Sequence, residues 1–217
     1  MNKFFRVVFY IAGCVILAFG IMLNTKAGLG VSPIISFPYS VSQIAGVNFS
    51  VIAFFVYASF VVIQYLIDKS SRSIKLLFQV PFAFAFSTLL EVFGRFLKDV
   101  PKIMWLQIVV LIFAVVLIGI GISLTVNMDY VPNPADGLAR SVGNALKKDM
   151  GFGKNTVDAI SILLTCTVGL LLAGKIYGVG IGTVVAVILT GRVVKVFNML
   201  FKDKMLKLAG LSEKNEA

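Results

Sequence analysis

The sequence contains no histidine and only two cysteines, so it has few of the side chains that most often bind catalytic metals. Cys14 and Cys166 both lie in apolar stretches, where a free cysteine usually behaves as a small hydrophobic residue. The chain also has no serine in a nucleophile elbow and no pair of acids within one apolar stretch. We therefore expect neither an enzyme nor a bound metal or cofactor.

Charge is scarce as well: charged residues make up 14% of the chain, and only 10 residues are acidic. Hydrophobic residues make up 59%, against roughly 45–50% in soluble domains. Apolar stretches of about 20 residues recur, and each is long enough to cross a bilayer as a helix. The net charge of +10 comes from basic residues between these stretches, a pattern that suits lipid headgroups rather than nucleic acid.

This pattern predicts an all-α integral membrane protein, a single domain over residues 1–217, with six transmembrane helices. We place them at residues 4–24, 48–67, 76–97, 104–125, 157–174 and 177–199. The segments on the side of both termini hold 15 of the 20 basic residues. By the positive-inside rule the N- and C-termini are cytoplasmic, the latter as a short polar tail at 206–217.

Two connecting segments, residues 25–47 and 126–156, are too polar and too interrupted to cross the bilayer. Each holds a short helix-forming stretch, at about 34–45 and 134–148, that reaches only about 20 Å. Such a helix either dips into the membrane or lies flat at its interface, and the sequence leaves both open. If both helices dip, their positive N-terminal ends favour an anionic or acceptor-rich solute.

The starts of these short helices resemble each other. Asn133 is a good helix cap, and Pro134 suits the first turn because it has no N–H to leave unpaired. Ser32 and Pro33 form the same pair, although Pro38 allows a later start with Ser36 as the cap. These four cap and proline residues are candidate substrate-binding residues.

Three further residues complete the candidate substrate-binding site. Asp136 complements the positive end of the second short helix. Glu91 is the only acid well inside a predicted span, where an ionisable group is costly, although Arg95 one turn on could simply neutralise it. Gln79 either lines a cavity or packs near the cytoplasmic end of its span. Asp158 falls at the predicted start of a span, and we interpret it as complementing the helix dipole.

A shift of 101 residues lays the first span on the fourth without a gap. It brings Gly20 onto Gly121 and the two cap–proline pairs onto each other, although chance similarity of apolar helices is the alternative. The predicted halves, about 1–100 and 101–205, each hold three spans. Because three is odd, the halves run in opposite directions through the membrane, an inverted repeat of the kind common in secondary transporters.

Residues 28–33, Gly-Leu-Gly-Val-Ser-Pro, and residues 178–183, Gly-Val-Gly-Ile-Gly-Thr, resemble the bacterial YczE/YyaS/YitT group of small membrane proteins. The Asn-Pro-Ala-Asp-Gly stretch at 133–137 is consistent with that group. The likeness covers nearly the whole chain in length and layout. It implies a multi-pass protein of the bacterial inner membrane, and it carries over no catalytic residues.

These features predict a permease that moves a small solute, anionic or acceptor-rich, by alternating access of two inverted halves. One alternative is an accessory membrane protein that binds a partner or lipid. Another is the substrate-capture subunit of a vitamin importer, although the first span lacks an Ala-x-x-x-Ala docking surface. The expected partners are the lipid bilayer and a small solute, but not nucleic acid. A homodimer or a membrane partner protein is left open.

Overall fold

A computed structural model describes residues 2–211, and these residues are almost entirely helical. The elements are α1 Asn2–Lys26, α2 Pro33–Ala45, α3 Phe49–Ile67, the short 3-10 helix η1 Lys69–Ser71, α4 Ile74–Phe96, α5 Met104–Asn127, α6 Pro134–Ala145, α7 Met150–Ala173 and α8 Ile181–Ala209. Six of them, α1, α3, α4, α5, α7 and α8, are long and apolar enough to span a membrane. The predicted all-α fold with six candidate spans is confirmed.

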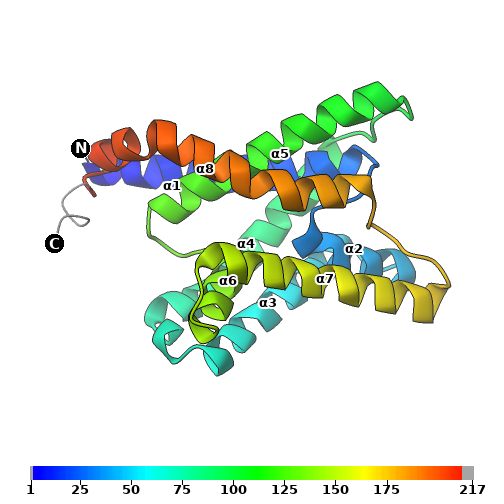
Figure 1. The fold of residues 1–217 in the computed structure, drawn as a ribbon, viewed down its shortest axis with the longest axis horizontal. Helices are drawn as coiled ribbons and strands as arrows, with labels where there is room; N and C mark the ends of the chain where they lie inside the picture. Colours follow the sequence, from blue (N-terminus) through cyan, green and yellow to red (C-terminus); the bar gives the residue numbers. More distant parts are fainter. Residues whose placement is uncertain (1, 212–217) are drawn as a thin grey trace.

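The helices pack in two layers (Figure 1). Helices α1, α5 and α8 form one layer, helices α2, α3, α6 and α7 form the other, and α4 packs against α1 and α3 between them. The start of α1 and the end of α8 lie at the same end of the bundle. We call this end the N-terminal face and the other end the opposite face.

The outer surface of the bundle is apolar. Phe96, Leu171 and Met199 expose 80%, 78% and 76% of their surfaces, and many other large hydrophobic side chains also point outward. A continuous apolar surface of this kind is unfavourable in water but matches hydrocarbon, while each helix satisfies its own backbone hydrogen bonds. The chain is therefore a multi-pass membrane protein in contact with the lipid bilayer.

Helices α1 and α5 approach each other closely because glycines lie between them. A Cβ atom added at Gly121 would lie 2.7 Å from the backbone of Leu17, and one added at Gly20 would lie 3.0 Å from the backbone of Ile118. Small residues allow this approach in membrane bundles, where dispersion contacts hold helices together. Gly20 and Gly121 are also the glycines that the shift of 101 aligns.

Neither short helix crosses the bundle, since α2 has 13 residues and α6 has 12. Each follows a cap residue with nearly the same backbone angles: Ser32 has φ −56° and ψ 138°, and Asn133 has φ −56° and ψ 137°. Helix α2 begins at Pro33, so the later start at Ser36 is wrong. A proline removes only one intrahelical hydrogen bond, and the buried Pro38 is held by packing against neighbouring helices.

Helix α7 begins seven residues before the predicted span 157–174, at Met150. The carboxylate of Asp149 accepts a hydrogen bond from the backbone N–H of Phe152 at 2.7 Å and so caps the helix there. Asp158 consequently lies in the third turn. Its interpretation as a residue that complements the helix dipole is wrong, because that effect fades beyond the first turn.

The glycine run at 178–180 forms a loop rather than the start of the last span. Its backbone docks on the loop before α2: Val31 donates to the carbonyl of Gly178 and Gly182 donates to the carbonyl of Leu29, both at 2.7 Å. Helix α8 starts at Ile181 and continues into the predicted tail as far as Ala209. The rest of that tail, residues 212–217, lies outside the described residues.

Candidate functional site

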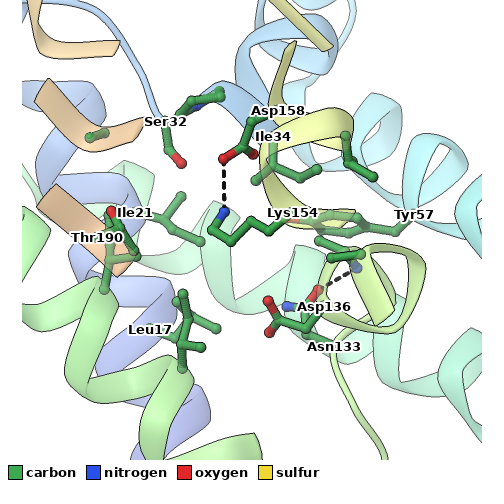
Figure 2. A pocket seen from close by; sticks show the side chains of 17 residues that line it. Leu17, Ile21, Ser32, Ile34, Tyr57, Asn133, Asp136, Lys154, Asp158 and Thr190 are labelled. Atoms are coloured by element: carbon green, nitrogen blue, oxygen red, sulfur yellow. Dashed lines mark hydrogen bonds and ion pairs between the residues drawn. The ribbon is translucent and has the colours of Figure 1, made fainter. Parts of the chain in front are cut away.

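A buried cavity of about 30 Å³ lies between the two layers, where both short helices begin (Figure 2). Ser32 and Pro33 line it from the start of α2, and Asn133 and Asp136 line it from the start of α6. The other walls come from α1, α3, α5, α7 and α8. The cavity has room for about two water molecules. The two short helices therefore dip into the bundle and begin at one place.

The cavity walls contain five pairs of residues that are 101 positions apart. Examples are Leu17 with Ile118, Ser32 with Asn133, and Tyr57 with Asp158. This is the shift that aligns the first and fourth spans in the sequence. The last pair extends the offset of 101 to α3 and α7, two helices for which the sequence alone showed no such alignment.

Three aspartate or lysine side chains line the cavity, and all three come from the second half of the chain. Lys154 and Asp158 lie one turn apart on α7, and the Lys154 ammonium donates a hydrogen bond to Asp158 Oδ2 at 3.0 Å. Asp136 approaches from α6 (Figure 2). The positions 101 residues earlier hold Ile35, Ala53 and Tyr57. The two sets of positions therefore differ in charge.

Asp136 lies on a helix that does not span the membrane. Burial raises the pKa of its carboxyl group from 3.8 to about 6. The cations of Lys154 and Arg140 oppose this rise, and the carboxylate of Asp158 adds to it. A carboxyl group with such a pKa exchanges its proton close to neutral pH, a property frequent at functional sites.

Polar atoms at the cavity lack partners among residues 2–211. The Tyr57 side chain is 1% exposed, and its hydroxyl makes no hydrogen bond; the same holds for Asp158 Oδ1. The Asp136 carboxylate receives no hydrogen bond from the described part of the chain. Buried polar groups nearly always have a partner, so these atoms indicate a site that water or a ligand completes.

The structure brings together four of the seven predicted site residues: Ser32, Pro33, Asn133 and Asp136 line the cavity. Pro134 lies directly beside them, and its carbonyl accepts a hydrogen bond from Gln64 Nε2 at 3.1 Å. Its backbone thus ties the start of α6 to α3.

Gln79 and Glu91 lie in other places. The Gln79 amide is buried and bonds the amide of Gln64 at 3.0 Å, beside a hollow of about 220 Å³ at the N-terminal face. Glu91 lines a hollow of about 430 Å³ towards the opposite face. It accepts hydrogen bonds from Arg95 at 2.9 Å and from Asn48 at 2.8 Å. Neither side chain lines the central cavity.

Three cavity residues, Tyr57, Lys154 and Asp158, are not among the predicted site residues. Lys154 falls in the predicted connecting segment 126–156, but it lies in the second turn of α7. One signal could have identified the other two: continuing the shift of 101 places the aromatic Tyr57 on the acidic Asp158.

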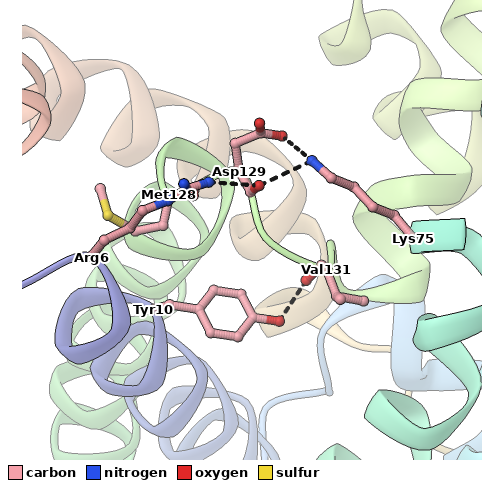
Figure 3. A network of polar contacts seen from close by, with 6 residues as sticks. All are labelled: Arg6, Tyr10, Lys75, Met128, Asp129 and Val131. Atoms are coloured by element: carbon pink, nitrogen blue, oxygen red, sulfur yellow. Dashed lines mark hydrogen bonds and ion pairs between the residues drawn. The ribbon is translucent and has the colours of Figure 1, made fainter. Parts of the chain in front are cut away.

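A polar network holds the loop before α6 at the N-terminal face (Figure 3). Arg6 of α1 donates to the carbonyls of Met128 and Asp129 at 2.7 and 3.0 Å. Lys75 of α4 bonds the Asp129 carboxylate at 2.9 Å. Tyr10 donates to the carbonyl of Val131 at 2.6 Å. This network joins two long helices to the segment that positions Asn133.

A protein family of unknown function, DUF6198, matches residues 4–199. The chain belongs to this family. The family's description assigns no activity to DUF6198 proteins, and it does not name the YczE/YyaS/YitT group, so that resemblance stays a prediction. No curated protein and no solved structure gives a significant match to this DUF6198 chain.

Proposed function

We propose that this DUF6198 protein is a permease that moves a small solute by alternating access of two inverted halves. The observation that carries the proposal is that both short helices begin at one buried cavity that contains ionisable side chains and unpartnered polar atoms. Many secondary transporters place their binding sites where non-spanning or interrupted helices begin, at the junction of two repeats. We further propose that the N-terminal face, with its excess of basic residues, is cytoplasmic.

Each short helix is tied to a long helix of the other half. The hydroxyl groups of Ser36 on α2 and Thr165 on α7 are 2.8 Å apart and share a hydrogen bond. Gln64 on α3 bonds the carbonyl of Pro134 on α6. Thr165 lies 101 residues after Gln64. The four helices of this layer can therefore tilt as one body against the layer of α1, α5 and α8, which supports alternating access.

Contacts close the cavity towards both faces. At the N-terminal face these are the bonds of Arg6 and Lys75 to Asp129. At the opposite face the loop before α2 is bonded to the loop before α8, and Lys26 pairs with Asp99 at 3.0 Å. A transport cycle would break one set of contacts while keeping the other.

Thiol labelling from the two sides of the membrane tests this proposal without a known substrate. In a background with both native cysteines replaced by alanine, Ser141→Cys reports on the hollow at the N-terminal face. Val179→Cys reports on a hollow of about 360 Å³ at the opposite face. Replacing Arg6 and Lys75 by glutamine should increase labelling at position 141 and decrease it at position 179. An increase at 141 with no change at 179 would contradict alternating access.

One observation favours the alternative of an accessory protein. Helix α8 packs on α5 and α1 but barely touches α7, so a long apolar flank is left for lipid or a partner protein. An accessory protein of this kind needs no reciprocal change at positions 141 and 179, so the same labelling experiment distinguishes the two functions. No contact among residues 2–211 favours the vitamin-importer alternative.

A further inference from the structure

We infer that the central cavity binds a small cation with several N–H donors, ammonium or a small primary amine, at Asp136 and in competition with the side chain of Lys154. The inference that this cation is transported rests on the proposed permease function, whereas the inference that it binds rests on the cavity alone. The ligand's charge is then opposite to that of the anionic solute predicted from the helix ends in the sequence.

The charges of the cavity do not balance without a ligand. The single cation, Lys154, is paired with Asp158 at 3.0 Å, which leaves the carboxylate of Asp136 without an ion pair or a hydrogen bond among the described residues. A buried ion without a partner is costly in a low-dielectric interior. A bound cation would remove this cost, whereas an anion would add to it.

The N–H groups at the helix starts are largely occupied, which weakens the case for an anion. At α6, Pro134 has no N–H, the N–H of Ala135 is bonded to Asn133 Oδ1 at 3.0 Å, and the N–H of Gly137 is bonded to the Asn133 carbonyl at 2.8 Å. At α2 the N–H of Ile35 is bonded within the first turn. Anion sites at helix ends need free N–H groups pointing at the ligand.

The unpartnered atoms at the cavity are mainly acceptors. They include the Asp136 carboxylate and Asp158 Oδ1, together with the Tyr57 hydroxyl, which can also accept. An ammonium group offers three or four N–H donors and a positive charge, so it can satisfy all of them at once. An ion such as potassium supplies the charge but no N–H donors that could form directed hydrogen bonds with these acceptors.

Lys154 indicates that the cavity can hold an ammonium group, because its own ammonium already lies there beside Asp158. Figure 2 shows this side chain reaching across the cavity towards Asp158, with Asp136 below it. The side chain acts as a tethered amine that pairs with Asp158 when no solute is bound. A free amine would take its place between Asp136 and Asp158 and displace it. The volume of about 30 Å³ admits only a compact ligand of this kind without opening.

The experiment is a binding assay on the purified full-length protein in detergent at pH 8, with radiolabelled methylammonium as the cation probe and radiolabelled acetate as the anion probe. We expect saturable binding of methylammonium and none of acetate. Asp136→Asn, which keeps the shape of the side chain, should weaken methylammonium binding by about 30-fold or more, as removal of one partner of a buried charge pair does. Binding of acetate alone, or an unchanged affinity of Asp136→Asn, would overturn the inference.

A second variant removes the tethered amine and keeps both acids. Lys154→Gln leaves the carboxylates of Asp136 and Asp158 to the ligand, so it should bind methylammonium more tightly than the wild type. A loss of binding in this variant, with the protein still monodisperse, would contradict displacement of Lys154. This variant also decides the question if Asp136→Asn does not fold.

Uptake into proteoliposomes separates this inference from the proposed function. Methylammonium binding without uptake would contradict the permease function and support the cation site. Uptake of another solute by a protein that does not bind methylammonium would support the permease function and contradict the cation site.

Discussion

Tyr57 and Asp158 lie 101 residues apart in the chain and line the same buried cavity, one from α3 and the other from α7. The same offset aligns the first and fourth spans in the sequence, yet one residue is a phenol and the other an acid. Each holds a buried oxygen without a hydrogen-bond partner among the described residues. The offset of 101 thus joins two cavity residues that differ in chemistry.

The first prediction concerns the pH dependence of stability through Asp136. Its pKa is about 6 in the folded protein against an ordinary 3.8, so the folded state binds this proton more tightly than the unfolded state does. The contribution of Asp136 to the free energy of unfolding is therefore greatest below pH 4 and is lost as the pH rises through 6. The melting temperature of the wild type should fall relative to that of Asp136→Asn between pH 5 and pH 8.

The other titratable groups that act on Asp136 are Arg140 on α6 and Lys154 and Asp158 on α7, and all of them are kept in that variant. Tyr57 on α3 also lines the cavity, and a phenol carries no charge over this pH range. A difference in melting temperature that stays constant with pH would show that Asp136 does not titrate there.

The second prediction concerns the packing of α1 on α5. Gly121→Ala places a methyl group about where Leu17 lies and should destabilise the protein by about 1–3 kcal/mol, as overpacking does. Gly191→Ala on α8 is the matched control, because among residues 2–211 its added methyl group meets nothing within 4 Å beyond its own helical turn. That control should be neutral or stabilising by up to about 1 kcal/mol. Unfolding titrations in mixed micelles measure both, and equal effects would argue against the close approach.

The third prediction compares the two helix caps. The Asn133 side chain accepts a hydrogen bond from the N–H of Ala135, whereas the Ser32 side chain makes no such bond. Asn133→Ala should therefore cost about 1 kcal/mol of stability, and Ser32→Ala should cost much less. Because Asn133 also positions the first turn of α6, we expect its loss to weaken methylammonium binding. Thermal unfolding of the two variants side by side checks the difference.

The fourth prediction concerns Glu91. It pairs with Arg95, which is largely exposed, and it lies outside the central cavity. Glu91→Gln should cost less than about 1 kcal/mol of stability and leave the affinity for methylammonium unchanged. The control is Asp136→Asn in the same binding assay. If both variants lost binding equally, Glu91 would have to be part of the solute pathway.

The fifth prediction concerns orientation. Reporter fusions at Ser71 and Met150 should report a cytoplasmic location, and a fusion at Lys102 should report the other side, because the basic residues concentrate on the side of Ser71 and Met150. An inside signal at Lys102 would be incompatible with six spans and with inverted halves.

Several features could be predicted from the sequence because they depend on local properties of the chain. The length of an apolar stretch decides whether a helix can cross hydrocarbon, so all six spans were predicted with errors confined mainly to their ends. The pairs Ser32-Pro33 and Asn133-Pro134 mark helix starts because capping needs only neighbouring residues. The shift of 101 was visible because the glycines and prolines repeat.

Tertiary packing alone decided which polar side chains meet. Glu91 and Asp158 are both acids on apolar helices, yet only Asp158 reaches the cavity, and Lys154 joins it because α7 begins earlier than its hydrophobic pattern indicates. In a membrane the lipid-facing and buried sides of a helix are similarly apolar, so the rotation of the helix cannot be read from its pattern. The cluster of Asp136, Lys154 and Asp158 exists only because α6 dips beside α7 and turns its first residues towards that helix.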